Sequence, residues 1–137
     1  MNKDRETLVV MSVDRATKSN SVNAANRVLF RKYLDRLGFE YDLAESVYIE
    51  DGQDDFGREQ SFIIECEDSV SIALLHTVAA VFEQEYMLKV ENGFCKLMPV
   101  LVGCKYENLG KWVKVDEDVA KDKGYYTKTK DGYFIAR

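Results

Sequence analysis

The chain is very poor in histidine, the residue that most often performs acid–base chemistry: His76 is the only one in 137 residues. It falls inside a helix-like apolar segment, where a polar side chain at the edge of a helix face is the ordinary interpretation. Mechanisms that pair serine or cysteine with histidine are therefore poorly supported. A zinc site is unsupported for the same reason, because such sites draw mainly on histidine and cysteine.

Cysteine is also scarce. Cys66, Cys95 and Cys104 are odd in number, form no Cys-x-x-Cys pair, and each lies in an apolar run. This pattern predicts reduced, buried thiols in a reducing compartment.

Long apolar runs and blocks of basic charge are absent too. No stretch approaches the roughly 20 apolar residues that a membrane-spanning helix needs, and the mixed-charge residues 1–6 lack the apolar core of a signal peptide. Acidic and basic residues are interleaved, with a formal net charge of −5, so no basic face for phosphates is visible. We expect a cytoplasmic protein that binds neither membranes nor nucleic acid.

The motifs of common nucleotide and hydrolase sites are missing as well. The sequence contains no GxGxxG, P-loop, GxSxG or HExxH pattern, each of which has a defined role in phosphate binding, nucleophile display or zinc binding. Pattern alone therefore leaves the function open.

What the chain does contain is clear apolar periodicity, which predicts a single domain over residues 1–137. Gly38 is a natural end for the first helix, Asp68 or Ser69 a natural start for the second, and Asn92-Gly93 a tight hairpin turn. Strands are expected at 7–13, 43–50, 60–67, 86–90 and 94–102, helices at 22–37 and 69–84, and tail strands at 111–115, 125–129 and 133–136.

Each predicted helix carries one apolar face, and we expect these two faces to pack on the sheet. The face of the first helix comprises Val22, Ala25, Leu29, Tyr33 and Leu37, and that of the second comprises Val70, Leu74, Val78 and Val81.

The order of elements predicts an α+β fold, a ferredoxin-like βαββαβ sandwich with extra C-terminal strands. Both helices then cover one face of the sheet, on which Phe62, Ile64 and Cys66 lie, while Ile63 and Met87 fall on the other. An uncovered apolar sheet face predicts a homo-oligomer. The alternative is that the C-terminal strands fold back over this face within one chain.

Five polar residues lie at strand ends and in loops, where sites usually form. Each has an ordinary alternative: a solvated loop charge, a strand aromatic, an exposed turn charge or a solvated helix end. The five are Ser12 and Arg15 after the first strand, Tyr48 in the second, Glu59 before the third, and Gln84 at the end of the second helix.

In combination, these and other short motifs resemble the bacteriophage S-adenosylmethionine lyases, formerly called S-adenosylmethionine hydrolases (SAMases). The likeness runs from about Leu8 to the C-terminus and rests on order and spacing, because no single motif is specific. The matching features are Ser12-Val-Asp-Arg15, Val22-Asn23, Tyr48 eleven residues before Glu59, Cys66-Glu67-Asp68, Glu83-Gln84-Glu85, Gly110-Lys-Trp112, Gly124-Tyr-Tyr-Thr127 and Gly132.

The resemblance implies a PII-like homotrimer with active sites between subunits and no cofactor. It implies cleavage of S-adenosylmethionine to methylthioadenosine and homoserine lactone, which in a phage would counter methylation-dependent host defence. Glu59 and Tyr48 are then the expected catalytic residues, and Ser12, Arg15 and Gln84 the expected substrate-binding residues.

Three other functions remain open at this point. The same topology suits a PII-like nucleotide-binding sensor that does not turn its ligand over. An acidic inhibitor of a DNA-binding partner is weakly supported, because a decoy carries dense acidic blocks. True hydrolysis would give homoserine in place of the lactone.

Overall fold

The computed structural model describes residues 7–49, 56–101 and 105–137. These ranges contain eight strands and three helices. In order they are β1 (Thr7–Met11), α1 (Asn20–Leu37), β2 (Tyr41–Ile49), β3 (Phe56–Cys66), α2 (Ser69–Val81), β4 (Tyr86–Glu91), β5 (Phe94–Pro99), β6 (Glu107–Val115), α3 (Glu117–Lys123), β7 (Tyr126–Thr129) and β8 (Gly132–Ala136).

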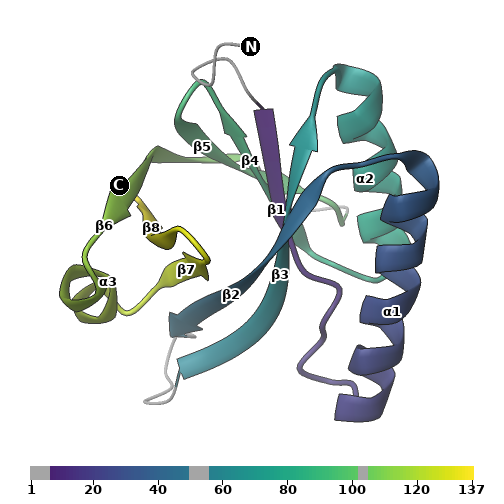
Figure 1. Cartoon of the computed structure of the whole chain (residues 1–137), viewed down its shortest axis with the longest axis horizontal. Coiled ribbons are helices and arrows are strands. Elements are labelled where there is room, and N and C mark those ends of the chain that lie inside the picture. Colours follow the sequence, from purple (N-terminus) through teal and green to yellow (C-terminus); the bar gives the residue numbers. More distant parts are fainter. Residues whose placement is uncertain (1–6, 50–55, 102–104) are drawn as a thin grey trace.

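The strands form one antiparallel sheet that closes into a barrel in the order β1-β3-β2-β7-β8-β6-β5-β4. β1 lies between β3 and β4. The ring closes between β2 and β7 over a short stretch, in which residues 45–47 of β2 pair with residues 126–128 of β7. In Figure 1 the C-terminal strands curve away from β2 and β4 to complete the ring.

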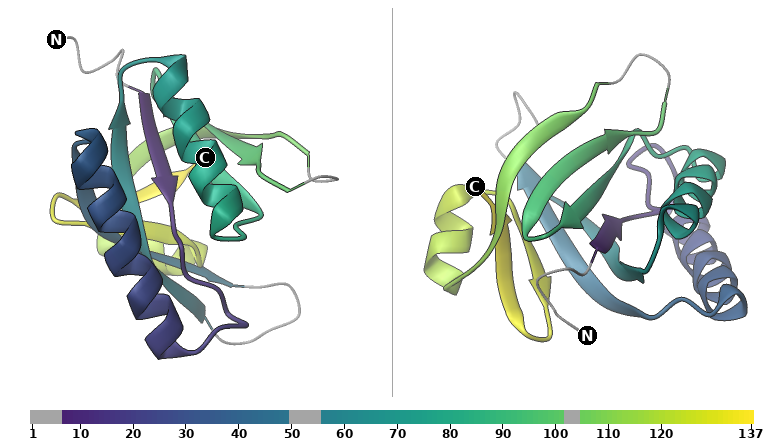
Figure 2. Two further views of the ribbon diagram at one scale, coloured as in Figure 1. Left: turned by 90° about the vertical axis from the view of Figure 1, so that its right-hand side faces the viewer. Right: turned by 90° about the horizontal axis from the view of Figure 1, so that it is seen from above.

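α1 and α2 lie side by side on the outside of the barrel, against β1 and β3 (Figures 1 and 2). The core beneath them is fully buried and includes Phe30 and Leu34 from α1, Leu75 from α2, and Phe62 and Ile64 from β3. The rings of Phe30 and Phe62 meet edge to face, with centroids 4.9 Å apart, which is a geometry that aromatic pairs prefer. This core fixes both helices on the β1–β3 ribbon.

A second, smaller core lies inside the barrel. Val10, Val90 and Cys95 form its buried centre, and Ile63 and Trp112 pack against them from opposite sides of the ring. The indole of Trp112 stacks on Phe134 of β8 at 5.3 Å. The C-terminal strands therefore cover the face of β1, β3 and β4 that the helices leave free.

The prediction of a ferredoxin-like sandwich is wrong. The order β-α-β-β-α-β is present, but the sheet continues from β4 through β5, β6, β8 and β7 and returns to β2. The apolar face represented by Ile63 is buried within the chain, and Met87 lies in the helix-side core. The sheet face that predicts an oligomer is thus covered by the C-terminal strands of the same chain, and the alternative of C-terminal strands folding back matches the structure.

The predicted core faces of the helices are largely wrong as well. In α1 the buried residues are Asn23, Phe30 and Leu34, while Leu29 on the predicted face is 57% exposed. In α2 Val78 is buried as expected, but Val81 is 73% exposed. The buried face of α1 includes the polar residue Asn23. A prediction from hydrophobicity alone therefore selects the adjacent face, which contains Leu29.

Helix ends and turns agree better with the sequence. Gly38 ends α1 with a φ of 78°, and Asp68 caps α2 by accepting a hydrogen bond from the Ser71 backbone N–H at 2.8 Å. α1 begins earlier than expected because Ser19 is its cap, and α3 was not predicted. Among the described residues, no helix is long and apolar enough to cross a membrane.

Candidate functional site

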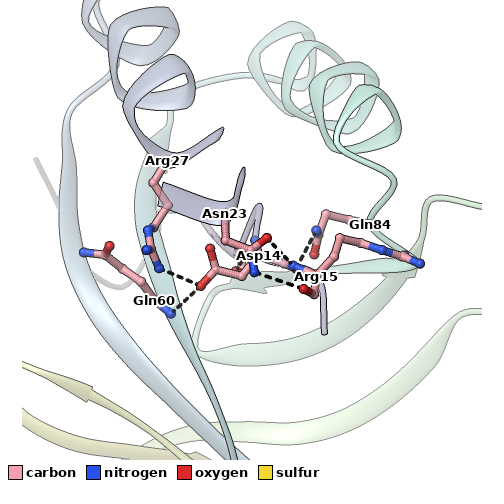
Figure 3. Close-up of polar contacts among 7 residues, drawn as sticks. Asp14, Arg15, Asn23, Arg27, Gln60 and Gln84 are labelled. Atoms are coloured by element: carbon pink, nitrogen blue, oxygen red, sulfur yellow. Dashed lines mark hydrogen bonds and ion pairs between the residues drawn. The ribbon is translucent and has the colours of Figure 1, made fainter. Parts of the chain in front are cut away.

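The segment that follows β1 is held by a network of polar contacts between the two long helices and β3 (Figure 3). Asp14 is at its centre. One carboxylate oxygen, Oδ2, accepts hydrogen bonds from Nη1 of Arg27 at 3.0 Å and from the backbone N–H of Gln60 at 3.2 Å. The backbone of Asp14 is held too: its N–H donates to Oγ of Ser12 at 2.9 Å.

The backbone N–H of Gln60 can donate to Asp14 because β1 ends early. The β1–β3 register runs only as far as Met11 opposite Phe62, so β3 extends past the end of its neighbour. A strand edge without a neighbour presents unpaired backbone groups. The carboxylate of Asp14 satisfies one of them and so ties the segment to β3.

The other carboxylate oxygen of Asp14, Oδ1, is buried and has no hydrogen-bond partner within residues 7–49, 56–101 and 105–137. The Asp14–Arg27 ion pair is itself largely removed from solvent, with 11% and 28% of the two side chains exposed. Leaving a buried acceptor unsatisfied costs about 1–3 kcal/mol. Such groups are rare in folded proteins and call for an explanation.

Two amide side chains complete the network. Oδ1 of Asn23 accepts from the Arg15 backbone N–H, and Nδ2 of Asn23 donates to the Arg15 carbonyl, both at 3.0 Å. Nε2 of Gln84 donates to the carbonyl of Asp14 at 3.0 Å and to that of Phe82 at 3.4 Å. Asn23 and Gln84 are both buried, so they fix the segment from α1 and from the α2–β4 connection.

Arg15 also reaches toward the α2–β4 connection. Its guanidinium Nη1 donates a hydrogen bond to the backbone carbonyl of Glu83, a residue with a φ of 58°. Ser12, Arg15 and Gln84, which the sequence predicts as binding residues, therefore gather at one end of the helix layer.

Glu59 lies beside this network but on a different face of β3. Side chains alternate along a strand, so Gln60 shares the helix-side face of Phe62 while Glu59 shares the inner face of Ser61 and Ile63. Glu59 is partly buried and is the cross-strand partner of Ser46 in β2. Its position is thus at the inner wall of the barrel.

The inner wall next to Glu59 is polar. Ser61 donates its hydroxyl to Oγ of Ser46 at 2.6 Å, and Ser46 lies 3.3 Å from Oγ1 of Thr127 in β7. Ser61 and Thr127 are buried. A carboxylate beside a row of hydroxyls offers both charge and hydrogen bonds to a polar ligand.

Tyr48 pairs with Gly57 in the β2–β3 register, two positions along from the Ser46–Glu59 pair. Its backbone therefore runs next to that of Glu59. The side chain of Tyr48 lies outside the described residues, and its predicted role stays a prediction.

Sequence reasoning missed Asp14, Arg27 and Gln60. Asp14 lies inside the Ser12-Val-Asp-Arg15 motif, and Asn23 inside the Val22-Asn23 pair, so the motifs contained part of the information. Arg27 and Gln60 lie in no motif, and only the meeting of α1 with β3 brings them to Asp14.

Other candidate chemistry is limited. In residues 7–49, 56–101 and 105–137, no group of three or more His, Cys, Asp or Glu side chains could hold a metal ion. Cys66 and Cys95 are buried and free, which confirms the prediction for these two, and Cys104 lies outside the described residues. Nε2 of His76 lies 2.9 Å from the carbonyl of Pro99 and donates its N–H to it.

A hollow of about 340 Å³ lies elsewhere, where the end of α1 meets the start of α2. None of the five predicted site residues lines it. Its walls are formed by Leu37, Gly38, Phe39, Glu40, Glu65, Glu67, Ser71 and Leu74.

Comparison with known families gives the class of protein. Residues 9–137 match the model of the S-Adenosylmethionine lyase family, which covers the barrel, both long helices and the polar network. The chain belongs to this family and is an S-adenosylmethionine lyase. A search of the curated proteins gave no match.

Proposed function

We propose that the protein converts S-adenosylmethionine to methylthioadenosine and L-homoserine lactone, and that Glu59 is its central catalytic residue. The observation that carries the proposal is the position of Glu59. It lies on the inner barrel wall opposite Ser46, and the next residue, Gln60, is bonded to the segment that contains Ser12 and Arg15. This bond ties the segment that carries Ser12 and Arg15 to the backbone next to Glu59, which supports a common site at the edge between the helix-side and inner faces of β3.

The proposed reaction needs neither a general acid nor a general base. The carboxylate oxygen of the substrate attacks the γ-carbon of its own methionine tail as the bond from that carbon to the sulfonium sulfur breaks. The electron pair of that bond stays on sulfur, so methylthioadenosine leaves as a neutral thioether. No proton is taken up or released, which fits a protein with one histidine held by a backbone carbonyl.

Catalysis then depends on bending the substrate and holding it. Orienting two reacting groups can contribute about 7–11 kcal/mol to lowering a barrier. The attacking carboxylate and the sulfonium lose charge as they react, so a partly dry pocket favours the transition state.

In this scheme Glu59 binds the α-ammonium group of the substrate. That contact holds the tail and keeps Glu59 from acting as a competing nucleophile. Tyr48 makes a hydrogen bond near the reacting tail, and Ser12, Arg15 and Gln84 hold the adenosine or the carboxylate. Charge-assisted hydrogen bonds of this kind are stronger than neutral ones.

The wider assignments follow from the resemblance. We propose a homotrimer with sites between subunits, working without a cofactor in the cytoplasm, which is the host cytoplasm if a phage encodes the protein. Depleting the methyl donor there would counter methylation-dependent defence.

The direct test is to incubate the purified protein with S-adenosylmethionine and to look for methylthioadenosine by chromatography. Glu59→Gln should lower kcat/KM about 100-fold, because it removes a charged contact to the substrate worth nearly 3 kcal/mol at about 1.4 kcal/mol per tenfold. Glu45→Gln is the matched control, since Glu45 pairs with Arg58 in an exposed contact on the neighbouring strand. Near-normal turnover by Glu59→Gln would remove the central assignment.

Proton release separates cyclisation from hydrolysis. Direct hydrolysis to homoserine liberates one proton per methylthioadenosine, whereas lactone formation liberates none until the lactone opens. A pH-stat trace that lags behind methylthioadenosine supports cyclisation, and so does lactone free of label in oxygen-18 water. Binding of S-adenosylmethionine without any product would instead favour the nucleotide-sensor function.

A further inference from the structure

We propose that Asp14 is a positioning residue of the lyase site, which sets the segment of residues 12–15 against β3 beside Glu59. The inference rests on the proposed function and assigns a role to a residue that the sequence comparison did not single out. Asp14 does not contact the reacting atoms in this scheme. It acts through the residues on either side of it.

The contacts of Asp14 reach four parts of the fold. Its Oδ2 binds Arg27 of α1 and the backbone of Gln60 in β3. Its carbonyl accepts from Gln84 in the α2–β4 connection, and its N–H donates to Ser12 at the end of β1. One residue therefore joins every element that supplies a described candidate side chain.

The neighbours of these contacts are the proposed substrate-binding residues. Arg15 follows Asp14 in the chain, and Gln60 follows Glu59. The hydroxyl of Ser12 accepts a hydrogen bond from the backbone N–H of Asp14. A shift of the Asp14 carboxylate would move the 12–15 segment relative to the backbone that carries Glu59. Orientation-dependent chemistry is sensitive to shifts of this kind, since a misplacement of about 1 Å can cost about 100-fold in rate.

The free oxygen of Asp14 argues against a purely structural role. Among the described residues, Oδ1 of Asp14 is the buried side-chain oxygen or nitrogen without a hydrogen-bond partner. A buried oxygen without a partner lowers stability, and costs of this kind are typical of functional sites.

The test compares Asp14→Asn and Arg27→Gln with Arg27→Lys and with Lys18→Ala. Asn keeps the size of the side chain and Lys keeps the cation. The side chain of Lys18, which lies between β1 and α1, makes an exposed ion pair with Glu83 at 3.9 Å. Circular dichroism selects a temperature at which every variant is folded. kcat and KM are then measured separately for methylthioadenosine formation.

We expect Asp14→Asn and Arg27→Gln each to lower kcat about tenfold or more, with KM changed less than about threefold, because orientation is lost while binding contacts remain. Arg27→Lys should keep most of the kcat of the unaltered protein. A variant that combines Asp14→Asn with Arg27→Gln should have a kcat no lower than that of the slower single variant. Lys18→Ala should match the unaltered protein.

Two results overturn different claims. Folded Asp14→Asn with unchanged kcat, in a preparation whose unaltered protein is active, contradicts the positioning role and leaves the proposed function intact. An unaltered protein that makes no methylthioadenosine overturns the proposed function and the positioning role together.

Discussion

Two buried thiols make the stability of the protein sensitive to alkaline pH. Burial raises the pKa of Cys66 and of Cys95 from 9.0 to about 11, with a smaller contribution from the charge of Asp68 at Cys66. The folded chain therefore keeps these protons when the unfolded chain begins to lose them. The stabilising effect is complete below about pH 9 and is lost as the pH rises towards 11.

We expect the urea midpoint of unfolding to fall between pH 9 and pH 11. Lysine and tyrosine also titrate in this range, so the matched comparison is a Cys66→Ala, Cys95→Ala double variant. It lacks the two thiols and should lose stability less steeply with pH, although its packing is weaker. Equal slopes for the two chains would contradict the assignment.

The sequence predicts individual residues best where a motif surrounds them. Ser12, Arg15 and Gln84 lie together in one polar network, and their role in substrate binding stays a prediction. Arg27 could not be found this way, because its partner Asp14 is thirteen residues away and the contact depends on how α1 lies on β3.

The helices give a sharp test of which face packs on the barrel. Phe30 of α1 is fully buried against Phe62 and Phe82, while its neighbour Leu29 is 57% exposed. Phe30→Ala should therefore cost about 3–5 kcal/mol of unfolding free energy, and Leu29→Ala less than about 0.5 kcal/mol. Chemical denaturation of both variants measures the difference, and a larger loss for Leu29→Ala would restore the face that the sequence favours.

Element boundaries were predictable where local chemistry decides them. Gly38 ends a helix because it adopts a left-handed backbone conformation at little cost, and Asn92 and Gly93 turn the β4–β5 hairpin with φ values of 52° and 80°. The orientation of α1 was not predictable, since its buried stripe includes Asn23, whose amide is used by the Arg15 backbone.

At the scale of the whole molecule, subunit number is the main open prediction. Light scattering over a range of concentrations should give three times the mass of the chain if sites form between subunits. Large apolar side chains on the outer surface of α2, such as Val70 and Val81, are exposed in the single chain, and burying such groups favours association. A mass equal to one chain at every concentration would exclude the trimer.

The closure of the barrel between β2 and β7 could not be predicted from local sequence patterns. It depends on three register pairs between β2 and β7, which join Ser46 to Thr127 and their neighbours across some eighty positions. Local patterns predict the β7–β8 hairpin but not which distant strand it meets. The same closure creates the inner wall on which Glu59 and the row of hydroxyls lie.

The closed ring also limits how the protein can meet other chains. Each described strand is bonded to a neighbour on both sides over part of its length, so only short stretches of edge are offered for a foreign strand to extend the sheet. Subunits would have to join through side chains, and the native protein should resist the edge-to-edge stacking from which amyloid fibrils grow.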